Sequence, residues 1–265
     1  MPYTTKLDLD INPSISILRN LSEQDFIVLL AGITEPSKVF ADKNMAQRVN
    51  IDGVQQLLRF AVERNAKVLF FSSVEVFGEK GSPHHESSIT NPLNAYGVMK
   101  EENEKLISGE FPLGRYSIIR TPWIVNPVNG SRCVITQTAN GIKSGVMRFA
   151  SDYFISLVSA EQVLDHLEVA LTKFDVDLPT HLHFVSKGYI SRFDLANKVG
   201  QVLFANRYKV QEGRFDDLVL KESRSRDTRM ISRISWKRPF NPPENINFVI
   251  ARQLEVMKKR GEFNA

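Results

Sequence analysis

Two kinds of hydrophobic pattern alternate along the first half of the chain, and each predicts a different element. Short apolar runs at Phe26–Ala31, Lys67–Ser73 and Tyr116–Thr121 are typical of buried strands. Between them, Val39–Arg64 carries apolar side chains at helical spacing, and Leu93–Ile107 is also predicted to be a helix. Strands that alternate with helices indicate a parallel sheet covered by helices. We therefore predict an α/β protein with a Rossmann-like parallel sheet.

The pattern becomes less regular after a loop at Asn126, Pro127 and Asn129-Gly130. We place a boundary there and divide the chain into residues 1–125 and 126–265, with part of the second region expected to return to the first sheet. The second region has its own predicted elements: helices at Ser159–Lys173, Arg192–Leu203 and Asn245–Lys259, and a strand at His181–Val185.

Charge and composition exclude several classes of protein. The net charge of +4 over 265 residues suits phosphorylated small molecules, but it is less concentrated than in a nucleic-acid binder, so we predict no nucleic-acid partner. The densest basic run, Lys221–Arg238, is either a solvated face or an anion site. No stretch approaches the roughly 18 uninterrupted apolar residues of a membrane helix. The single cysteine, Cys133, fits a reducing compartment, and no signal peptide is visible, so we expect a cytoplasmic protein.

Three side chains have the spacing expected of a proton-transfer site. Tyr96 and Lys100 lie four residues apart on a predicted helix and so project from one face. A lysine ammonium beside a phenol would lower the pKa of that phenol. Ser73 ends a predicted strand, at the edge where open α/β sheets bind ligands. The Tyr-x-x-x-Lys pattern alone arises by chance in many helices, but a preceding strand that ends in Ser-Ser makes it more specific.

Longer stretches around these residues resemble a known family. They are LLAGIT (Leu29–Thr34), RVNIDGVQQLL (Arg48–Leu58), FFSSVEVFG (Phe70–Gly78), PLNAYGVMKEENE (Pro92–Glu104) and YSIIRTPWI (Tyr116–Ile124). The chain resembles the extended short-chain dehydrogenases/reductases, also described as the NAD-dependent epimerase/dehydratase family. RTPWI and SRDTRMISRISWKRP (Ser225–Pro239) are most similar to the dTDP-4-dehydrorhamnose reductase branch.

The resemblance implies a fold and roles for individual residues. It implies a dinucleotide-binding region, a small C-terminal substrate lobe, NAD or NADP as cofactor and a nucleotide-linked sugar as substrate. In the catalytic and cofactor roles it implies Ser73 as the catalytic hydroxyl, Tyr96 as the acid/base, Lys100 at the nicotinamide ribose, and Asp10, Ile11, Ala31, Gly32 and Thr121 along the cofactor. Candidate substrate contacts are Glu75, Trp123 and Arg229; the alternatives are a solvated carboxylate, a packed aromatic ring and a solvated cation.

The front of the chain departs from the family pattern. The fourteen glycines include no G-x-G-x-x-G or G-x-x-G-x-x-G, so we expect an N-terminally shortened sheet without the glycine-rich turn. Two hypotheses follow. The protein is a NAD(P)-dependent epimerase, dehydratase or reductase of a sugar nucleotide, or it is a catalytically silent binding or regulatory protein that keeps the fold.

Metal binding and assembly can also be addressed from the sequence. His181 and His183 alternate on a predicted strand without an evident third ligand, so we predict no metal site. We predict a homodimer in which the helices Val39–Arg64 and Leu93–Ile107 pair with their copies. Its apolar stripe would be Val54, Leu57 and Leu58, unless these face the sheet.

The absent glycine-rich turn leads to a first testable prediction. We expect NAD and NADP to bind weakly or not at all, because that turn normally holds the pyrophosphate at a helix N-terminus. Isothermal titration calorimetry of the purified protein with each dinucleotide measures this. Micromolar or tighter affinity would contradict it and would mean that another segment replaces the turn.

Overall fold

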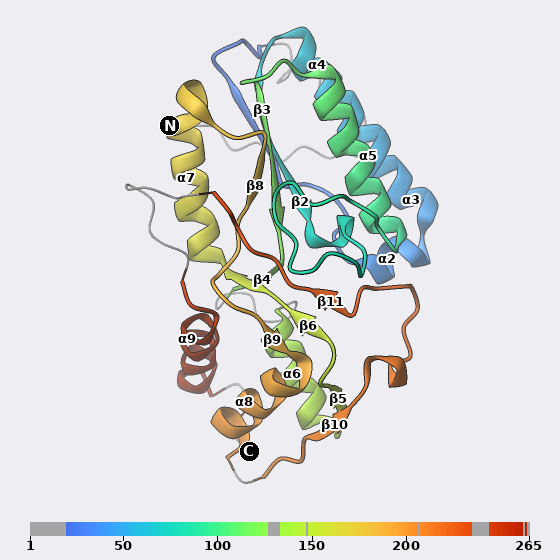
Figure 1. Cartoon of the computed structure of the whole chain (residues 1–265), viewed down its shortest axis with the longest axis vertical. Helices are drawn as coiled ribbons and strands as arrows, with labels where there is room; N and C mark the ends of the chain where they lie inside the picture. The colour runs from blue at the N-terminus through green and yellow to red at the C-terminus, as the bar shows by residue number, and fades with distance from the viewer. Residues whose placement is uncertain are drawn as a thin grey trace.

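A four-stranded parallel sheet forms the upper half of the molecule in Figure 1. The computed structural model describes residues 20–126, 133–146, 148–205, 207–234, 244–261 and 263. In order across the sheet, the strands are β1 (Phe26–Leu29), β2 (Lys67–Ser73), β3 (Tyr116–Thr121) and β8 (His181–His183). All three pairings are parallel, so the predicted Rossmann-like α/β sheet is confirmed.

Both faces of this sheet are buried, which explains the unbroken apolar runs of its strands. Val68 and Phe70 of β2 belong to the core on one face, whereas Leu69 and Phe71 belong to the core on the other. Successive side chains of a strand point to opposite faces, so a strand covered on both sides must be apolar at every position.

Helices cover the two faces unequally. One face carries α4 (Val54–Glu63) and α5 (Ala95–Glu110), with α2 (Pro36–Ala41) and α3 (Lys43–Gln47) beside α5; the other carries α7 (Ala160–Asp177) (Figure 1). None of the described helices combines the length and apolar composition needed to cross a bilayer.

The single helix predicted over Val39–Arg64 is wrong, because the structure divides it. Asp42 ends α2 and caps α3, accepting a hydrogen bond from the Met45 backbone N–H at 2.9 Å. A π-helical stretch, Arg48–Gly53, then joins α3 to α4. Within it, the side chain of Asn50 bonds both the N–H (2.7 Å) and the carbonyl (2.9 Å) of Ile33. Asn50 therefore ties this helix to the loop after β1.

The apolar stripe considered for a homodimer faces the sheet instead. Val54, Leu57 and Leu58 are buried in the core between α4, α5 and the strands. They are therefore not a dimer surface, and the predicted homodimer requires another one.

The lower half of the molecule has three helices around a separate core. These are α6 (Val134–Lys143), α8 (Arg192–Phe204) and α9 (Ile246–Lys259), which we call the lower lobe together with the short strands beside them. The strands are β4 (Trp123–Val125) with β7 (Leu157–Ser159), β5 (Arg148–Ala150) with β10 (Gln211–Gly213), and β6 (Phe154–Ile155) between β9 (Ile190–Ser191) and β11 (Asp227–Thr228).

Capping residues account for the starts of the later helices. Ser159, Ser191 and Asn245 each accept a backbone N–H at the first turn of α7, α8 and α9. Such side chains satisfy donors that would otherwise lack an intrahelical partner. The predicted starts of these helices agree with the structure to within one residue.

A buried ion pair joins the sheet to α5. Arg120 of β3 donates to Glu104 of α5 from Nε (3.0 Å) and from Nη2 (2.6 Å), and both side chains are almost fully buried. Arg120 Nη1 also donates to the Glu86 carbonyl at 3.2 Å, which ties the loop after β2 to the same strand.

We expect Glu104→Ala to lower the free energy of unfolding by about 3–5 kcal/mol, because the change leaves the Arg120 charge buried without its partner. The matched control is Glu255→Ala, which removes an exposed pair with Lys259 on α9 and should change the free energy of unfolding far less, because solvent screens that pair. Urea denaturation of both variants measures the difference. Similar losses in the two variants would show that the buried pair contributes no more to the free energy of unfolding than the exposed pair does.

Candidate functional site

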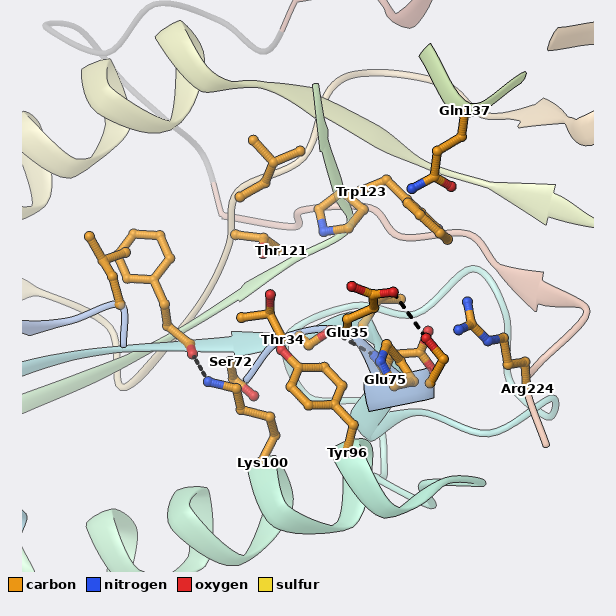
Figure 2. A pocket seen from close by; sticks show the side chains of 18 residues that line it. Thr34, Glu35, Ser72, Glu75, Tyr96, Lys100, Thr121, Trp123, Gln137 and Arg224 are labelled. Carbon is orange, nitrogen blue, oxygen red and sulfur yellow. Dashed lines mark hydrogen bonds between the residues drawn. The ribbon is translucent and has the colours of Figure 1, made fainter. Parts of the chain in front are cut away.

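A cavity of about 520 Å³ opens at the carboxyl ends of β2 and β3, where the sheet meets the lower lobe. Figure 2 shows side chains from both halves of the molecule converging on it. Its lining includes Ser72, Ser73, Glu75, Tyr96, Lys100, Thr121, Trp123, Gln137 and Arg224. Open α/β sheets bind their ligands at this edge.

The structure brings the predicted Ser73, Tyr96 and Lys100 together in the lining of this cavity. The Ser73 hydroxyl lies close enough to the Tyr96 phenol to lower the pKa of that phenol. Ser73 also caps the short 3-10 turn Val74–Val76, accepting from the Glu75 N–H at 3.2 Å. Lys100 donates to the Phe71 carbonyl at 2.7 Å, and its Nζ lies 5.9 Å from the centre of the Tyr96 ring.

The electrostatics of this group differ from the expectation that Lys100 lowers the pKa of Tyr96. Burial raises the pKa of the Tyr96 phenol above its usual value, and the Ser73 hydroxyl only partly offsets that effect. Burial also lowers the pKa of Lys100 to about 8, against the attraction of Glu104. For the phenol, burial is the largest of these effects and sets the direction of the pKa shift. Tyr96 is therefore protonated at neutral pH and suited to donate a proton.

Gly97, between Tyr96 and Lys100 in sequence, lets α5 approach the turn after β2. A Cβ atom placed at Gly97 would lie 2.1 Å from the Glu75 carbonyl oxygen. Only a residue without a side chain fits there. The glycine of the Tyr-Gly-Val-Met-Lys segment is therefore needed for a close backbone contact between α5 and the turn after β2.

Glu75 and Arg224 place opposite charges at the cavity. Glu75 accepts a 2.6 Å hydrogen bond from Asn94 Nδ2, and burial raises the pKa of its carboxyl. Arg224 is paired with Glu222 at 2.7 Å. Among the described residues of the basic run Lys221–Arg238, Arg224 is the arginine that lines the cavity, and sequence reasoning did not single it out.

Other predicted site residues fall into three groups: those in the cavity lining, those outside it, and those outside the described residues. Thr121 and Trp123 line the cavity, whereas Ala31 and Gly32 do not. Arg229, predicted to contact substrate, is also absent from the lining, because Asp227 binds its guanidinium at 2.6–3.0 Å. Asp10 and Ile11 lie outside the described residues.

Gly32 has a structural role. Its φ is +142°, and a Cβ there would lie 2.9 Å from Asn50 Oδ1. Within the described ranges, no three His, Cys, Asp or Glu side chains are grouped to hold a metal ion. His183 instead bonds the Ile231 carbonyl through Nδ1 at 2.9 Å.

Comparison with known proteins gives a consistent result. The family model "RmlD substrate binding domain" matches residues 2–246. A dTDP-4-dehydrorhamnose reductase of Mycolicibacterium smegmatis is 24% identical over 209 residues, which are 78% of this chain and 63% of that protein. The match thus spans less than two thirds of the length of this curated relative.

Solved structures share the fold. A dTDP-4-dehydrorhamnose reductase of Yersinia enterocolitica superposes with a TM-score of 0.80 at 24% identity, covering 94% of this chain and 87% of the other. A Bacillus anthracis reductase of the same name, in complex with NADP, gives a TM-score of 0.72 at 18% identity, covering 96% and 87%. At these identities the likeness establishes the fold.

A matched pair of glycines on α5 tests the close contact at Gly97. We expect Gly97→Ala to destabilise the protein, because its Cβ would overlap the Glu75 carbonyl oxygen. Gly109→Ala on the same helix meets no atom within 4 Å and should stabilise by about 0.5–1 kcal/mol through helix propensity. Thermal unfolding followed by circular dichroism compares them. Equal stabilisation by both changes would contradict the contact.

Proposed function

Since the chain belongs to the RmlD substrate binding domain family, we propose that it is a NAD(P)-dependent reductase acting on a keto sugar linked to a nucleoside diphosphate. The observation that carries this proposal is the presence of Ser73, Tyr96 and Lys100 in the lining of one cavity at the ends of β2 and β3. The relatives named above as dTDP-4-dehydrorhamnose reductases support the choice of reaction and of substrate class. The match covers 63% of that curated relative, so we propose the activity and the substrate of this chain from the site and from the family together.

Tyr96 would donate the proton that completes the reduction of the carbonyl. Its raised pKa keeps the phenol protonated until the substrate oxygen becomes an alkoxide, which is a stronger base than a phenolate. Ser73, which lies beside the Tyr96 phenol, would donate a hydrogen bond to the same substrate oxygen. Proton transfer would therefore follow the development of negative charge on the sugar.

The residues present fit the nicotinamide ribose end of a dinucleotide. Lys100 supplies an ammonium at the cavity, and its burial makes a further hydrogen bond to a ligand hydroxyl favourable. The hydroxyl of Ser72, also in the lining, is buried without a hydrogen-bond partner among the described residues. A reduced nicotinamide cofactor, when bound, would supply the hydride, which is the hydrogen on carbon together with the two electrons of the reduction.

The sugar would occupy the part of the cavity nearest the lower lobe. Trp123 offers an aromatic face there, and Gln137 of α6 and Arg224 offer polar groups (Figure 2). Glu75 would accept a hydrogen bond from a sugar hydroxyl. This mixture of one aromatic ring and several polar groups is suited to a hydroxylated ring.

A second candidate is a catalytically silent protein that binds a nucleotide sugar without converting it. The hydrogen bond from Lys100 to the Phe71 carbonyl supports this candidate, because it uses a donor that a cofactor ribose would otherwise take. Calorimetric binding of a dTDP-sugar, together with no NADPH oxidation in the presence of its keto form, would select it.

Tyr96→Phe tests the proton donor. We expect a loss of about 10²–10⁴-fold in kcat for NADPH-dependent reduction, because phenylalanine keeps the ring but removes the hydroxyl. Circular dichroism serves as the control for folding. A folded Tyr96→Phe protein with full activity would mean that another group supplies the proton.

The pKa of Lys100 leads to a pH prediction. Its ammonium is charged below about pH 8 and neutral above it, so kcat/KM should fall as the pH rises through that value. Lys105→Met removes an exposed lysine of α5, paired with Glu101, and should leave this limb unchanged. A flat wild-type profile from pH 7 to pH 9.5 would show that the charge of Lys100 is not required.

A further inference from the structure

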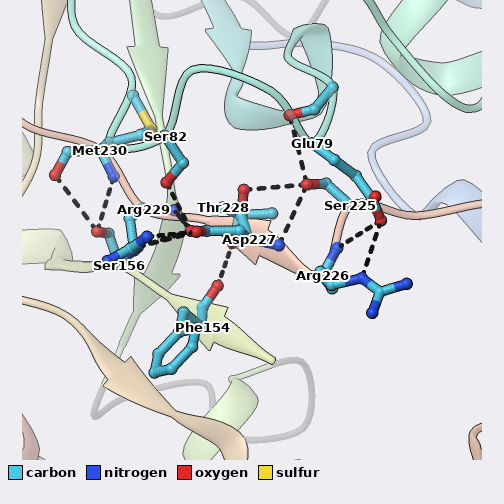
Figure 3. Close-up of polar contacts among 11 residues, drawn as sticks. Glu79, Ser82, Phe154, Ser156, Ser225, Arg226, Asp227, Thr228, Arg229 and Met230 are labelled. Carbon is cyan, nitrogen blue, oxygen red and sulfur yellow. Dashed lines mark hydrogen bonds and ion pairs between the residues drawn. The ribbon is translucent and has the colours of Figure 1, made fainter. Parts of the chain in front are cut away.

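Residues 222–234, which we call the strap, join the lower lobe to the loop that follows β2. Figure 3 shows the middle of the strap, Ser225–Met230, and its polar contacts. On the lower side, β11 of the strap pairs with β6, Thr228 Oγ1 donates to the Phe154 carbonyl at 3.1 Å, and the Met230 N–H donates to Ser156 Oγ at 3.0 Å. The strap is thereby fixed to the lower lobe along its middle.

The strap is also hydrogen-bonded to the sheet half of the molecule. Ser82 Oγ donates to Asp227 Oδ1 at 2.6 Å, and Arg226 forms an ion pair with Glu79 at 3.4 Å. Further along, the backbones of the strap and of His84 bond in both directions, at 2.8 and 2.9 Å. The first part of the strap carries Arg224 to the cavity.

Asn94 is the point where the strap meets the helix that bears Tyr96 and Lys100. Its Oδ1 caps α5, accepting the Gly97 N–H at 2.9 Å. Its Nδ2 donates to Glu75 at 2.6 Å and to the Ser223 carbonyl at 3.3 Å. The side chain of Asn94 is buried, so its three bonds join three separate segments without competition from solvent.

A helix cap alone needs only an acceptor, and serine or aspartate would serve equally well. The two bonds from Nδ2 need a donor, which an amide supplies and an aspartate does not. We propose that Asn94 is a positioning residue whose amide holds Glu75 and the strap, and through the strap Arg224, in register with Tyr96 and Lys100. This inference rests on the proposed function for its effect on turnover, but not for its effect on structure.

Hydrogen exchange tests the structural part without any substrate. We expect Asn94→Ser to leave the first turn of α5 protected, because serine still caps it. The amides of Arg226 and Asp227 in the strap should exchange about tenfold faster, the factor that corresponds to one lost hydrogen bond. Asn94→Ala should loosen both segments. Asn245→Ser exchanges the same residue types at the cap of α9 and should change neither.

Kinetics test the functional part. Glu75 faces Arg224 and Glu222 from the strap, Tyr96 from α5, and Tyr153. In Asn94→Asp a second carboxyl replaces the amide, and the pair can form a hydrogen bond only while it retains a proton. The activity of Asn94→Asp relative to wild type should therefore fall as the pH rises, whereas Asn94→Ser should lose about tenfold in kcat/KM without such a trend.

The outcomes separate the two proposals. An inactive wild-type protein would defeat the proposed function, and hydrogen exchange would still decide the role of Asn94. Unchanged amide exchange in the strap of Asn94→Ser would overturn the inference, and so would a ratio of Asn94→Asp to wild-type activity that does not vary with pH. Either result would mean that Asn94 acts only as a helix cap. Accelerated exchange in the strap of Asn94→Ser, with α5 still protected, supports it.

Discussion

The close contact between α5 and the turn after β2 determines where almost every group of the cavity lies. At Gly97 the helix approaches the backbone of Glu75 more closely than any side chain would permit, and Asn94 fixes the first turn of the helix at the same place. Tyr96 and Lys100 are thereby held against Ser73 and Phe71 at the end of the strand. The Arg120–Glu104 pair anchors the middle of the same helix to β3. The helix is thus fixed at two points, which leaves little freedom for the phenol to move relative to the strand ends.

Burial, rather than pairing between the two residues, dominates the chemistry of Tyr96 and Lys100. Desolvation shifts both pKa values toward the neutral form, upward for the phenol and downward for the ammonium. A ligand hydroxyl bound beside Lys100 would restore part of the solvation that the ammonium lost on folding. A ligand hydroxyl would therefore be a favourable hydrogen-bond partner for Lys100.

Patterns of apolar residues along the sequence predicted those elements that depend on residues close together in the chain. β2 and β3 have the predicted bounds, because a strand buried on both faces leaves an unmistakable apolar run. The division of the segment between Val39 and Arg64 depends on Asn50 reaching Ile33, seventeen residues earlier, and no helical periodicity contains that contact. The cavity arginine could not be identified for the same reason. Arg224 and Arg229 belong to the same basic run, and nothing in the sequence distinguishes them. In the structure Asp227 pairs with Arg229, whereas Arg224 lines the cavity.

The later part of the chain does not stay in the lower lobe, and this has a consequence for cooperativity. α7 and β8 cover one face and one edge of the sheet that the earlier residues build, packing on Leu69, Phe71 and Ile119. A fragment that stopped near residue 125 would expose this apolar face to water and leave one edge of β3 unpaired. Such surfaces associate with one another in solution. The sheet therefore cannot be completed until residues 160–183 have been synthesised, and these must fold back onto the earlier strands before that apolar face is protected from aggregation.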